Sequence, residues 1–167
     1  MPPSPGAAWG GTASYSFAVG WSGSLPSWNG PCDTATLLPA GILEQPAPGS
    51  FVARRPGIAE VHCRDGKLRL DVRQPDLIAI DPLGPMSRRE DRVLSAIVAD
   101  AKGALDLGDA EVQWTLPPQL RQGSRCEHML GTCLSGASVR IIADAPGDAQ
   151  VSARYGSLTG TATLHIE

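Results

Sequence analysis

A short stretch of this sequence occurs twice, with the second copy 90 residues after the first. Seven positions of a 13-residue window are identical in the two copies: Pro56, Gly57, Ala59, Val61, Arg64, Gly66 and Leu68 in the first, and Pro146, Gly147, Ala149, Val151, Arg154, Gly156 and Leu158 in the second. In both copies small and apolar residues alternate with polar ones, which is the period of a β-strand. The sequence therefore indicates that one β-rich unit is present twice.

Each copy is preceded by a second shared pattern, Val19-Gly20-Trp21 in the first and Val112-Gln113-Trp114 in the second. We expect Trp21 and Trp114 to occupy equivalent core positions, because large aromatic side chains are mostly buried. The repeat predicts two domains, residues 1–74 and 75–167, that are joined by a short linker containing Pro75. A linker of this kind restricts the relative motion of the domains.

The composition favours an all-β chain. Of the 167 residues, 19 are Gly and 15 are Pro, 42% are apolar and 5% are aromatic. Enough apolar residues are present for a buried core, and the frequent Gly and Pro are typical of short strands joined by many turns. Apolar or alternating runs predict strands in the second copy at residues 77–80, 93–99, 111–114, 138–143, 149–153 and 161–166. The polar stretch at residues 100–109 is expected to end the second of these strands.

Two segments of the second copy resemble bacterial immunoglobulin-like (Big) domains. The run from Gly147 to Gly156, followed by Gly160-Thr161-Ala162-Thr163-Leu164, is similar to the closing segment of that family. The loop Asp100-Ala101-Lys102-Gly103 is similar to the family's approach to its core Trp. The resemblance covers residues 76–167 well and residues 15–74 less completely. It implies two tandem immunoglobulin-like β-sandwich domains, and its motifs specify fold better than function.

The first copy departs from this pattern at its start. Only 20 residues precede Trp21, whereas about 38 residues of the second domain precede Trp114. One strand fits at residues 14–21, so the first domain is expected to lack its opening strands. Such a sandwich exposes a sheet edge, which favours strand capture from another chain. Three explanations stay open: the chain is part of a longer array, the domain is a shortened variant, or a neighbouring subunit donates a strand.

Four cysteines in a turn-rich β chain predict two disulfides and an oxidising compartment, although spacing alone allows three pairings. Cys126 and Cys133 bracket a short loop in which Gly131 is available for a turn, so a disulfide across this loop is easy to build. Cys63 lies in the repeated strand, and Cys32 is the expected partner that remains. The alternative is four reduced thiols in a cytoplasmic or virion protein.

Few residues suggest chemistry, and each has a simpler explanation. Cys126, His128 and Cys133 could ligate zinc, but they lack the paired spacing of structural zinc sites. An acidic cluster without the spacing of a calcium loop lies at Asp100, Asp106 and Asp109. His62 and Cys63 are adjacent on a strand, so their side chains point to opposite faces and cannot easily act as base and nucleophile. We therefore expect no enzyme, no catalytic residue, no cofactor and no metal site.

The charge distribution argues against nucleic acid as a partner. The net charge is -3, and 14 Lys and Arg residues are scattered among 17 Asp and Glu residues. The one local basic group, Arg88, Arg89 and Arg92, surrounds Glu90 and Asp91 and is predicted to be a solvated turn. No apolar run is long enough to span a bilayer as a helix. The first 12 residues do not resemble a secretory signal, so either a signal was removed or none existed.

These observations favour a non-enzymatic function. Trp9, Tyr15 and Trp28 are candidates for contact with a partner, or alternatively cover the incomplete sheet of the first domain. The resemblance implies a structural or adhesive module of a secreted or surface-displayed bacterial protein, which spaces domains or binds through protein or glycan contacts. The alternative is a structural subunit of a virion or extracellular filament that self-assembles through strand donation.

Overall fold

The computed structural model describes residues 13–25, 35–63, 66–127, 129 and 131–167. All regular elements in these segments are β-strands, and no helix occurs among them. The fold is all-β, as the sequence predicts. The chain divides into two compact units, Met1–Gln74 and Pro75–Glu167, which we call unit 1 and unit 2.

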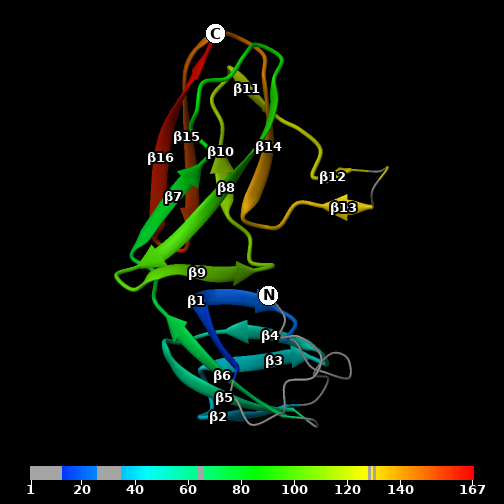
Figure 1. The fold of residues 1–167 in the computed structure, drawn as a ribbon, viewed down its shortest axis with the longest axis vertical. Helices are drawn as coiled ribbons and strands as arrows, with labels where there is room; N and C mark the ends of the chain where they lie inside the picture. The colour runs from blue at the N-terminus through cyan, green and yellow to red at the C-terminus, as the bar shows by residue number, and fades with distance from the viewer. Residues whose placement is uncertain (1–12, 26–34, 64–65, 128, 130) are drawn as a thin grey trace. The chain divides into compact units, whose positions relative to one another are not determined.

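Unit 2 has two layers of strands (Figure 1). Its strands are β7 (Leu77–Asp81), β8 (Asp91–Asp100), β9 (Gly103–Gly108), β10 (Gln113–Thr115), β11 (Leu120–Gln122), β12 (Cys126–Glu127), β13 (Thr132–Cys133), β14 (Ser138–Ala143), β15 (Gly147–Tyr155) and β16 (Leu158–Ile166). One layer has the order β7-β8-β14-β11, and the other has the order β10-β15-β16. These are the orders A-B-E-D and C-F-G of a constant-type immunoglobulin sandwich. The strand order of unit 2 therefore identifies an immunoglobulin-like fold.

Side chains at every second position of the strands form the core of unit 2. Every second residue of β14 is buried, and β15 follows the same rule from Ala149 to Tyr155. The segment that precedes β8 closes the edge of β16, because the Met86 N–H donates to the His165 carbonyl and the Glu167 N–H donates to the Met86 carbonyl, each at 2.8 Å. Apolar burial between two such layers is the main driving force for a sandwich of this kind.

Unit 1 is built around its first strand. Its strands are β1 (Ala13–Gly23), β2 (Thr36–Leu38), β3 (Leu43–Ala47), β4 (Ser50–Ala53), β5 (Gly57–Cys63) and β6 (Gly66–Arg73). Along its first half β1 runs parallel to β6, and at Ser22 and Gly23 it pairs antiparallel with β4. Gly20 lies between the two halves with a φ of 93°, a left-handed conformation that glycine adopts without steric cost. The order of strands is β2-β5-β6-β1-β4-β3.

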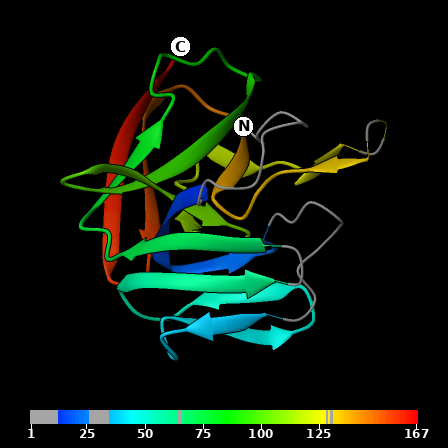
Figure 2. The same ribbon diagram turned by 60° about the horizontal axis from the view of Figure 1, so that its bottom comes forward.

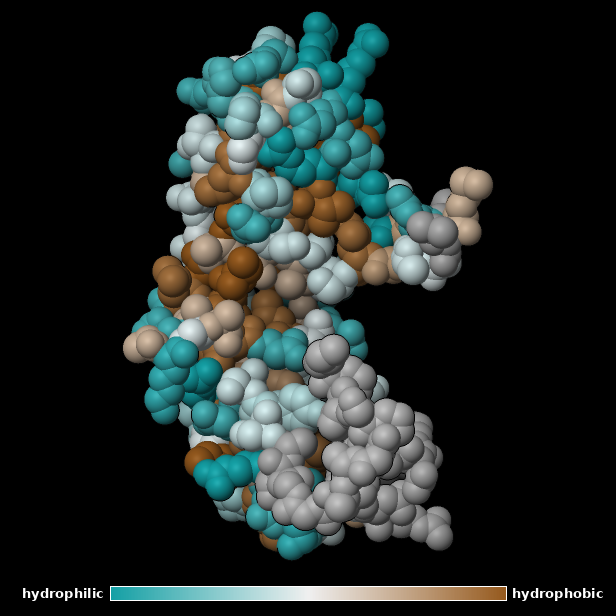
Figure 3. All heavy atoms as spheres, in the orientation of Figure 1, coloured by the Kyte–Doolittle hydropathy of each residue, from teal (hydrophilic) through white to brown (hydrophobic). Residues whose placement is uncertain are grey.

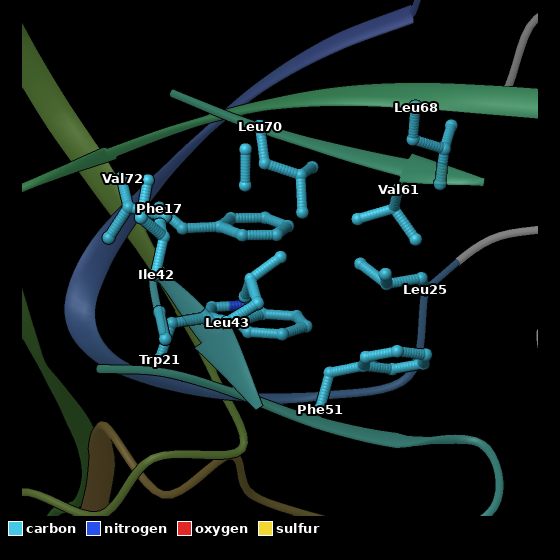
Figure 4. Packing of buried hydrophobic residues seen from close by; sticks show 12 residues of the cluster. Phe17, Trp21, Leu25, Ile42, Leu43, Phe51, Val61, Leu68, Leu70 and Val72 are labelled. Carbon is cyan, nitrogen blue, oxygen red and sulfur yellow. The ribbon is translucent and has the colours of Figure 1, made fainter. Parts of the chain in front are cut away.

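The core of unit 1 is centred on two stacked rings (Figure 4). The rings of Phe17 and Trp21 lie 4.0 Å apart between centroids, with 4° between their planes. Both rings come from β1. Buried side chains from the other strands, and from the segments just after β1 and just before β3, surround them: Leu25, Ile42, Leu43, Phe51, Ala53, Ala59, Val61, Leu68, Leu70 and Val72. Trp21 is only 3% exposed, so the expectation that it is a core residue is met.

The expected equivalence of Trp21 and Trp114 is wrong. Trp114 lies on β10, which pairs with β15, and is only half-buried. The strand of unit 1 that pairs in the same way with β5 is β2, whereas Trp21 lies on β1. A Val-x-Trp pattern fits any strand that is buried on one face, so it does not identify the strand.

The strands of unit 1 cannot be counted from an equivalence of the two Trp residues, because Trp21 and Trp114 lie on different strands. Among the described residues, β1 alone pairs with both β6 and β4. In unit 2, two different segments make the corresponding pairings. Met86 bridges to Ile166, and β8 pairs with β14. The edge of β6 is therefore paired within the chain over Leu68–Arg73.

The closing hairpins of the two units share their starts and differ in length. Gly57 of β5 and Gly147 of β15 begin the repeated strand, with φ values of 144° and 118°. The β5–β6 hairpin turns after Cys63, whereas β15 continues two residues further before its turn. An even number of added residues keeps the same side chains on the buried face. The repeated residues therefore occupy equivalent positions in β5 and β15, but not after the turn.

The sequence predicts residues 100–109 as a polar stretch between strands, and this prediction is wrong. They contain β9, which pairs with β8 from Leu105 to Gly103. Leu105 and Leu107 are each 6% exposed, and Asp106 separates them. Two leucines with the period of a strand are enough for one buried face, even in an otherwise polar stretch.

Candidate functional site

The most distinctive surface feature of unit 2 is the hairpin formed by β12 and β13. It lies in the connection between β11 and β14, and we call it the finger (residues 126–133). Cys126 and Cys133 face each other across the hairpin and are joined by a disulfide, as their spacing predicts. The finger projects away from both layers of the sandwich in two views of the molecule (Figure 1, Figure 2).

The finger exposes an apolar side chain. Met129 is 99% exposed, and the space-filling view shows the finger standing out from the surface of unit 2 (Figure 3). The backbone is closed by two hydrogen bonds: the Gly131 N–H donates to the Glu127 carbonyl at 3.0 Å, and the Leu134 N–H donates to the Arg125 carbonyl at 2.7 Å. The loop is thus held by a covalent bond and by backbone hydrogen bonds on either side of it.

Arg140 holds the base of the finger to the sandwich. Its Nε donates to the Ser124 carbonyl at 3.1 Å, and its Nη2 lies 3.6 Å from Glu127 Oε1. Its Nη1 lies 3.3 Å from Asp91 Oδ2 on β8. One guanidinium therefore joins the finger to two strands of the layer. A second ion pair, between Arg125 Nη1 and Glu111 Oε1 at 3.1 Å, ties the base to the segment before β10.

The chain also approaches the sandwich closely where it enters and leaves the finger. A Cβ at Gly123 would lie 2.9 Å from the Arg140 side chain, and a Cβ at Gly136 would lie 2.4 Å from the Ala110 carbonyl oxygen. The Val112 N–H donates to the Gly136 carbonyl at 2.9 Å. Glycine is required at Gly136 because any side chain there would overlap backbone.

Four of the six residues considered for metal binding have other partners. The disulfide accounts for Cys126 and Cys133, and His128 lies outside the described residues. Asp100 Oδ1 accepts the Lys102 N–H at 2.9 Å, and Asp106 Oδ1 accepts the Gly108 N–H at 2.8 Å. Aspartates that bond two residues ahead in this way stabilise turns. Over the described part of the chain, no cluster of three His, Cys, Asp or Glu side chains has the arrangement of a metal site.

The remaining candidate residues lie in unit 1. His62 Nε2 and Glu60 Oε1 form an ion pair on β5, and the hydrogen bond from His62 is the main cause that lowers the pKa of Glu60. Cys63 is disulfide-bonded, but the predicted pairing with Cys32 stays a prediction because Cys32 lies outside the described residues. These contacts leave no nucleophile and base in contact at this position.

The aromatic candidates for partner contact are not exposed where the structure describes them. Tyr15 is half-buried and packs against the core of unit 1, with its ring 6.2 Å from that of Phe17. Trp9 and Trp28 lie outside the described residues. Among the described residues, the large hydrophobic side chains that are exposed are all aliphatic: Leu38, Ile58, Leu77, Leu83, Ile97 and Met129.

One well-connected residue was missed at the sequence level. Arg92, which we expected in a solvated turn, has a side chain only 15% exposed. Its Nη2 donates to the Pro85 carbonyl at 2.6 Å and to Glu90 Oε1 at 2.8 Å, and its Nη1 donates to the Gly84 carbonyl. The pKa of Glu90 is lowered, first by the hydrogen bond from the Ser87 N–H and then by Arg92. Glu90 beside Arg92 was the only sequence signal of this contact.

Comparison with known proteins supplies no family for the chain. No protein-family model matches the sequence, and no curated protein matches it either. None of the described segments forms a helix of the length and hydrophobicity that crossing a membrane requires.

Several solved structures resemble the chain at low identity. Domains 4 and 5 of the S-layer protein SbsC share 16% identity over 80% of this chain and 75% of that one, with a TM-score of 0.40. SbsC domains 1–6 share 17% identity over 80% of this chain and 19% of that one, also with a TM-score of 0.40. The chain thus spans less than a fifth of that longer structure. The four N-terminal Ig domains of Dscam1 share 12% identity over 93% and 43% of the chains, with a TM-score of 0.32. Because all three TM-scores lie below 0.5, the fold assignment rests on the strand order of unit 2.

Proposed function

We propose that the chain is a non-enzymatic immunoglobulin-like module of a secreted or surface-displayed bacterial protein, and that the finger of unit 2 binds a protein partner. The finger is the observation that carries this proposal, because it is closed by a disulfide and presents Met129 to solvent. A loop whose conformation is held before binding loses less conformational entropy on binding. The flexible, polarisable side chain of methionine adapts to apolar pockets of different shapes. The disulfide also suits an oxidising, extracellular location.

A protein partner is favoured over a glycan. Proteins that bind sugars commonly stack an exposed aromatic ring on the sugar, and none of the exposed large hydrophobic side chains in the described segments is aromatic. Trp9 and Trp28 are the residues that a glycan-binding role would need, and both lie outside the described residues.

A spacing role accompanies this binding role. We assign residues 1–74 to a variant immunoglobulin-like domain and residues 75–167 to a complete one. The connection between their strands is short: β6 ends at Arg73, and the Asp76 N–H already donates to the Ala99 carbonyl of unit 2 at 3.0 Å. Only Gln74 and Pro75 lie between these points, which suits a module that sets a distance from a surface.

Binding of purified proteins tests this proposal. The full chain is immobilised on beads and offered a panel of purified extracellular-matrix and cell-surface proteins, with a glycan array in parallel. We expect binding to a protein of the panel that weakens at least about tenfold in Met129→Glu, because a charge is costly in an apolar contact. Leu83→Glu is the matched control, since Leu83 is exposed outside the finger.

Three outcomes would contradict the proposal. Binding to glycans alone would contradict a protein partner. Equal binding by wild type and Met129→Glu would show that the finger is not the binding site. Absence of binding to every protein of the panel would argue against an adhesive role.

A further inference from the structure

The outer face of the β10-β15-β16 layer is uncharged at its centre. We call this surface the outer face of unit 2. Its central side chains all carry hydroxyl or amide groups: Thr115, Gln150, Ser152, Thr161 and Thr163. The register places them side by side, with Gln150 opposite Thr163, and with Ser152 between Thr161 and Thr115. Three adjacent strands thus contribute to one polar, uncharged surface.

The same positions of unit 1 carry ionisable side chains. The buried residues Ala59 and Val61 match Ala149 and Val151, so Glu60 corresponds to Gln150. His62 likewise corresponds to Ser152. In unit 1 these outward residues lie opposite Arg69 and Lys67, and Glu60 pairs with His62 and with Lys67 Nζ at 3.7 Å.

The two hairpins therefore share their buried face and differ on their outer face. Surface charge is the ordinary state of an exposed strand, because it keeps proteins soluble and discourages association. The centre of the outer face of unit 2 lacks this charge. Depletion of charge at the centre, with charge kept at the rim, is one compositional feature of protein–protein interfaces.

The charges at the ends of this face are opposite in sign. Asp148 lies at the start of β15, where its Oδ1 is 2.8 Å from His165 Nδ1. Arg154 lies near the end of the same strand, where its Nε donates to the Gly156 carbonyl at 3.1 Å. Asp148 and Arg154 are six positions apart, which is about 20 Å along a strand. The face is therefore neutral in the middle, acidic at one end and basic at the other.

Addition of a strand at the edges of this layer is hindered. The edge of β16 is occupied by backbone hydrogen bonds from and to Met86. On the opposite edge, β10 has only three residues and is followed by Pro117 and Pro118, which offer no N–H groups for a ladder. Association through this layer is thus expected to use its face rather than its edges.

We propose that the outer face of unit 2 is the contact between two copies of this chain, packed face to face with their β15 strands antiparallel. A two-fold axis that lies between the faces, perpendicular to the strands at Val151, generates this arrangement. It places Asp148 opposite the partner's Arg154, and Arg154 opposite the partner's Asp148. Parallel packing would instead place like charges together at both ends, so the charges select the antiparallel dimer.

Charge exchange tests this dimer directly. Sedimentation velocity on the full chain should show a monomer–dimer equilibrium that shifts with protein concentration, since a face of three strands offers an area at the low end of specific interfaces. Asp148→Arg alone and Arg154→Asp alone should each weaken dimerisation at least about tenfold, because like charges then face each other. An equimolar mixture of these two variants should form a dimer again, because every charge then meets its opposite.

Matched controls separate this interface from general charge effects. Arg121→Asp changes the net charge of unit 2 on the other layer and should leave dimerisation unchanged. Circular dichroism should show that all variants retain the wild-type fold. A wild-type chain that stays monomeric up to millimolar concentration would overturn the proposal. So would single variants that dimerise as wild type does, or a mixture of the two variants that fails to associate.

Discussion

Single polar side chains close the loops of unit 2. Arg92 is the clearest case, because its guanidinium donates to two carbonyl groups and to the Glu90 carboxylate in the connection between β7 and β8. Arg140 does the same at the base of the finger. Both side chains lie on strands, so rigid backbone positions them. Half of their partners are backbone carbonyls, which no sequence pattern identifies.

Removal of the Arg92 side chain should destabilise unit 2. Arg92→Ala leaves the carbonyls of Gly84 and Pro85 without this donor, and we expect the free energy of unfolding to fall by about 2 kcal/mol. Arg121→Ala is the control, because its ion pair with Asp144 is 59% exposed on the Arg side and should be worth less than about 0.5 kcal/mol. Urea denaturation of both variants measures the difference. Equal effects would show that Arg92 is an ordinary surface residue.

The pKa of His165 should depend on Asp148. The hydrogen bond with Asp148 raises the pKa of His165 above its ordinary 6.5 because it favours the imidazolium. The folded state thus binds this proton more tightly, so the contribution to stability is complete below pH 6.5 and is lost as the pH rises through the raised pKa. NMR titration of Asp148→Asn should show a lower pKa for His165. An unchanged pKa would mean that the pair does not form in solution.

At the scale of elements, the closing hairpins and β1 organise the two units. Gly57 and Gly147 start equivalent strands, and the alternation that follows puts Ala59, Val61 and their counterparts into the cores. The different hairpin lengths preserve this alternation because they differ by an even number of residues. The finger is different in kind: its strands contribute no side chain to the core. It can therefore change without loss of the sandwich.

Loss of the finger disulfide should act locally. The chain-entropy model gives about 2.5 kcal/mol for a loop of this length, but the finger of a Cys126→Ser/Cys133→Ser variant can open while the sandwich stays folded. We expect faster hydrogen exchange at the Gly131 and Leu134 amides, which donate the closing hydrogen bonds. The unfolding midpoint of unit 2 should change by less than about 2 °C. Protected finger amides, or cooperative loss of unit 2, would contradict this prediction.

The whole molecule contains two cores, each built from its own continuous stretch of the chain. Residues of β1 to β6 build the cluster around Phe17 and Trp21, and the buried residues of unit 2 come from β7 to β16. Each unit therefore has what a domain needs to unfold as a cooperative block.

Calorimetry should resolve these two blocks. Leu70→Ala in unit 1 and Leu164→Ala in unit 2 each remove a fully buried side chain and should cost about 3 kcal/mol. We expect two thermal transitions, one lowered by Leu70→Ala and the other by Leu164→Ala. The two variants serve as controls for each other, because they make the same chemical change in different units. A single transition that both variants shift equally would show that the units unfold together.

Local patterns were enough for several features of this protein. Alternation of apolar residues and the frequency of Gly and Pro indicated an all-β chain, because both reflect backbone geometry over a few residues. The disulfide between Cys126 and Cys133 followed from a short spacing that contains a glycine. Most strands of unit 2 were predicted within a few residues, whereas β9 was missed because only two leucines mark it.

The sequence by itself thus determined the class of fold, the repeated hairpin strand and the finger disulfide. Only the tertiary structure decided that Trp21 and Trp114 lie on different strands, that β1 pairs with both β6 and β4, and that Arg92 holds a loop. It also decided that the uncharged side chains of three strands form one face. The physical reason is that strand pairing and side-chain partners depend on segments distant in the chain, whose meeting is set by the packing of a whole unit.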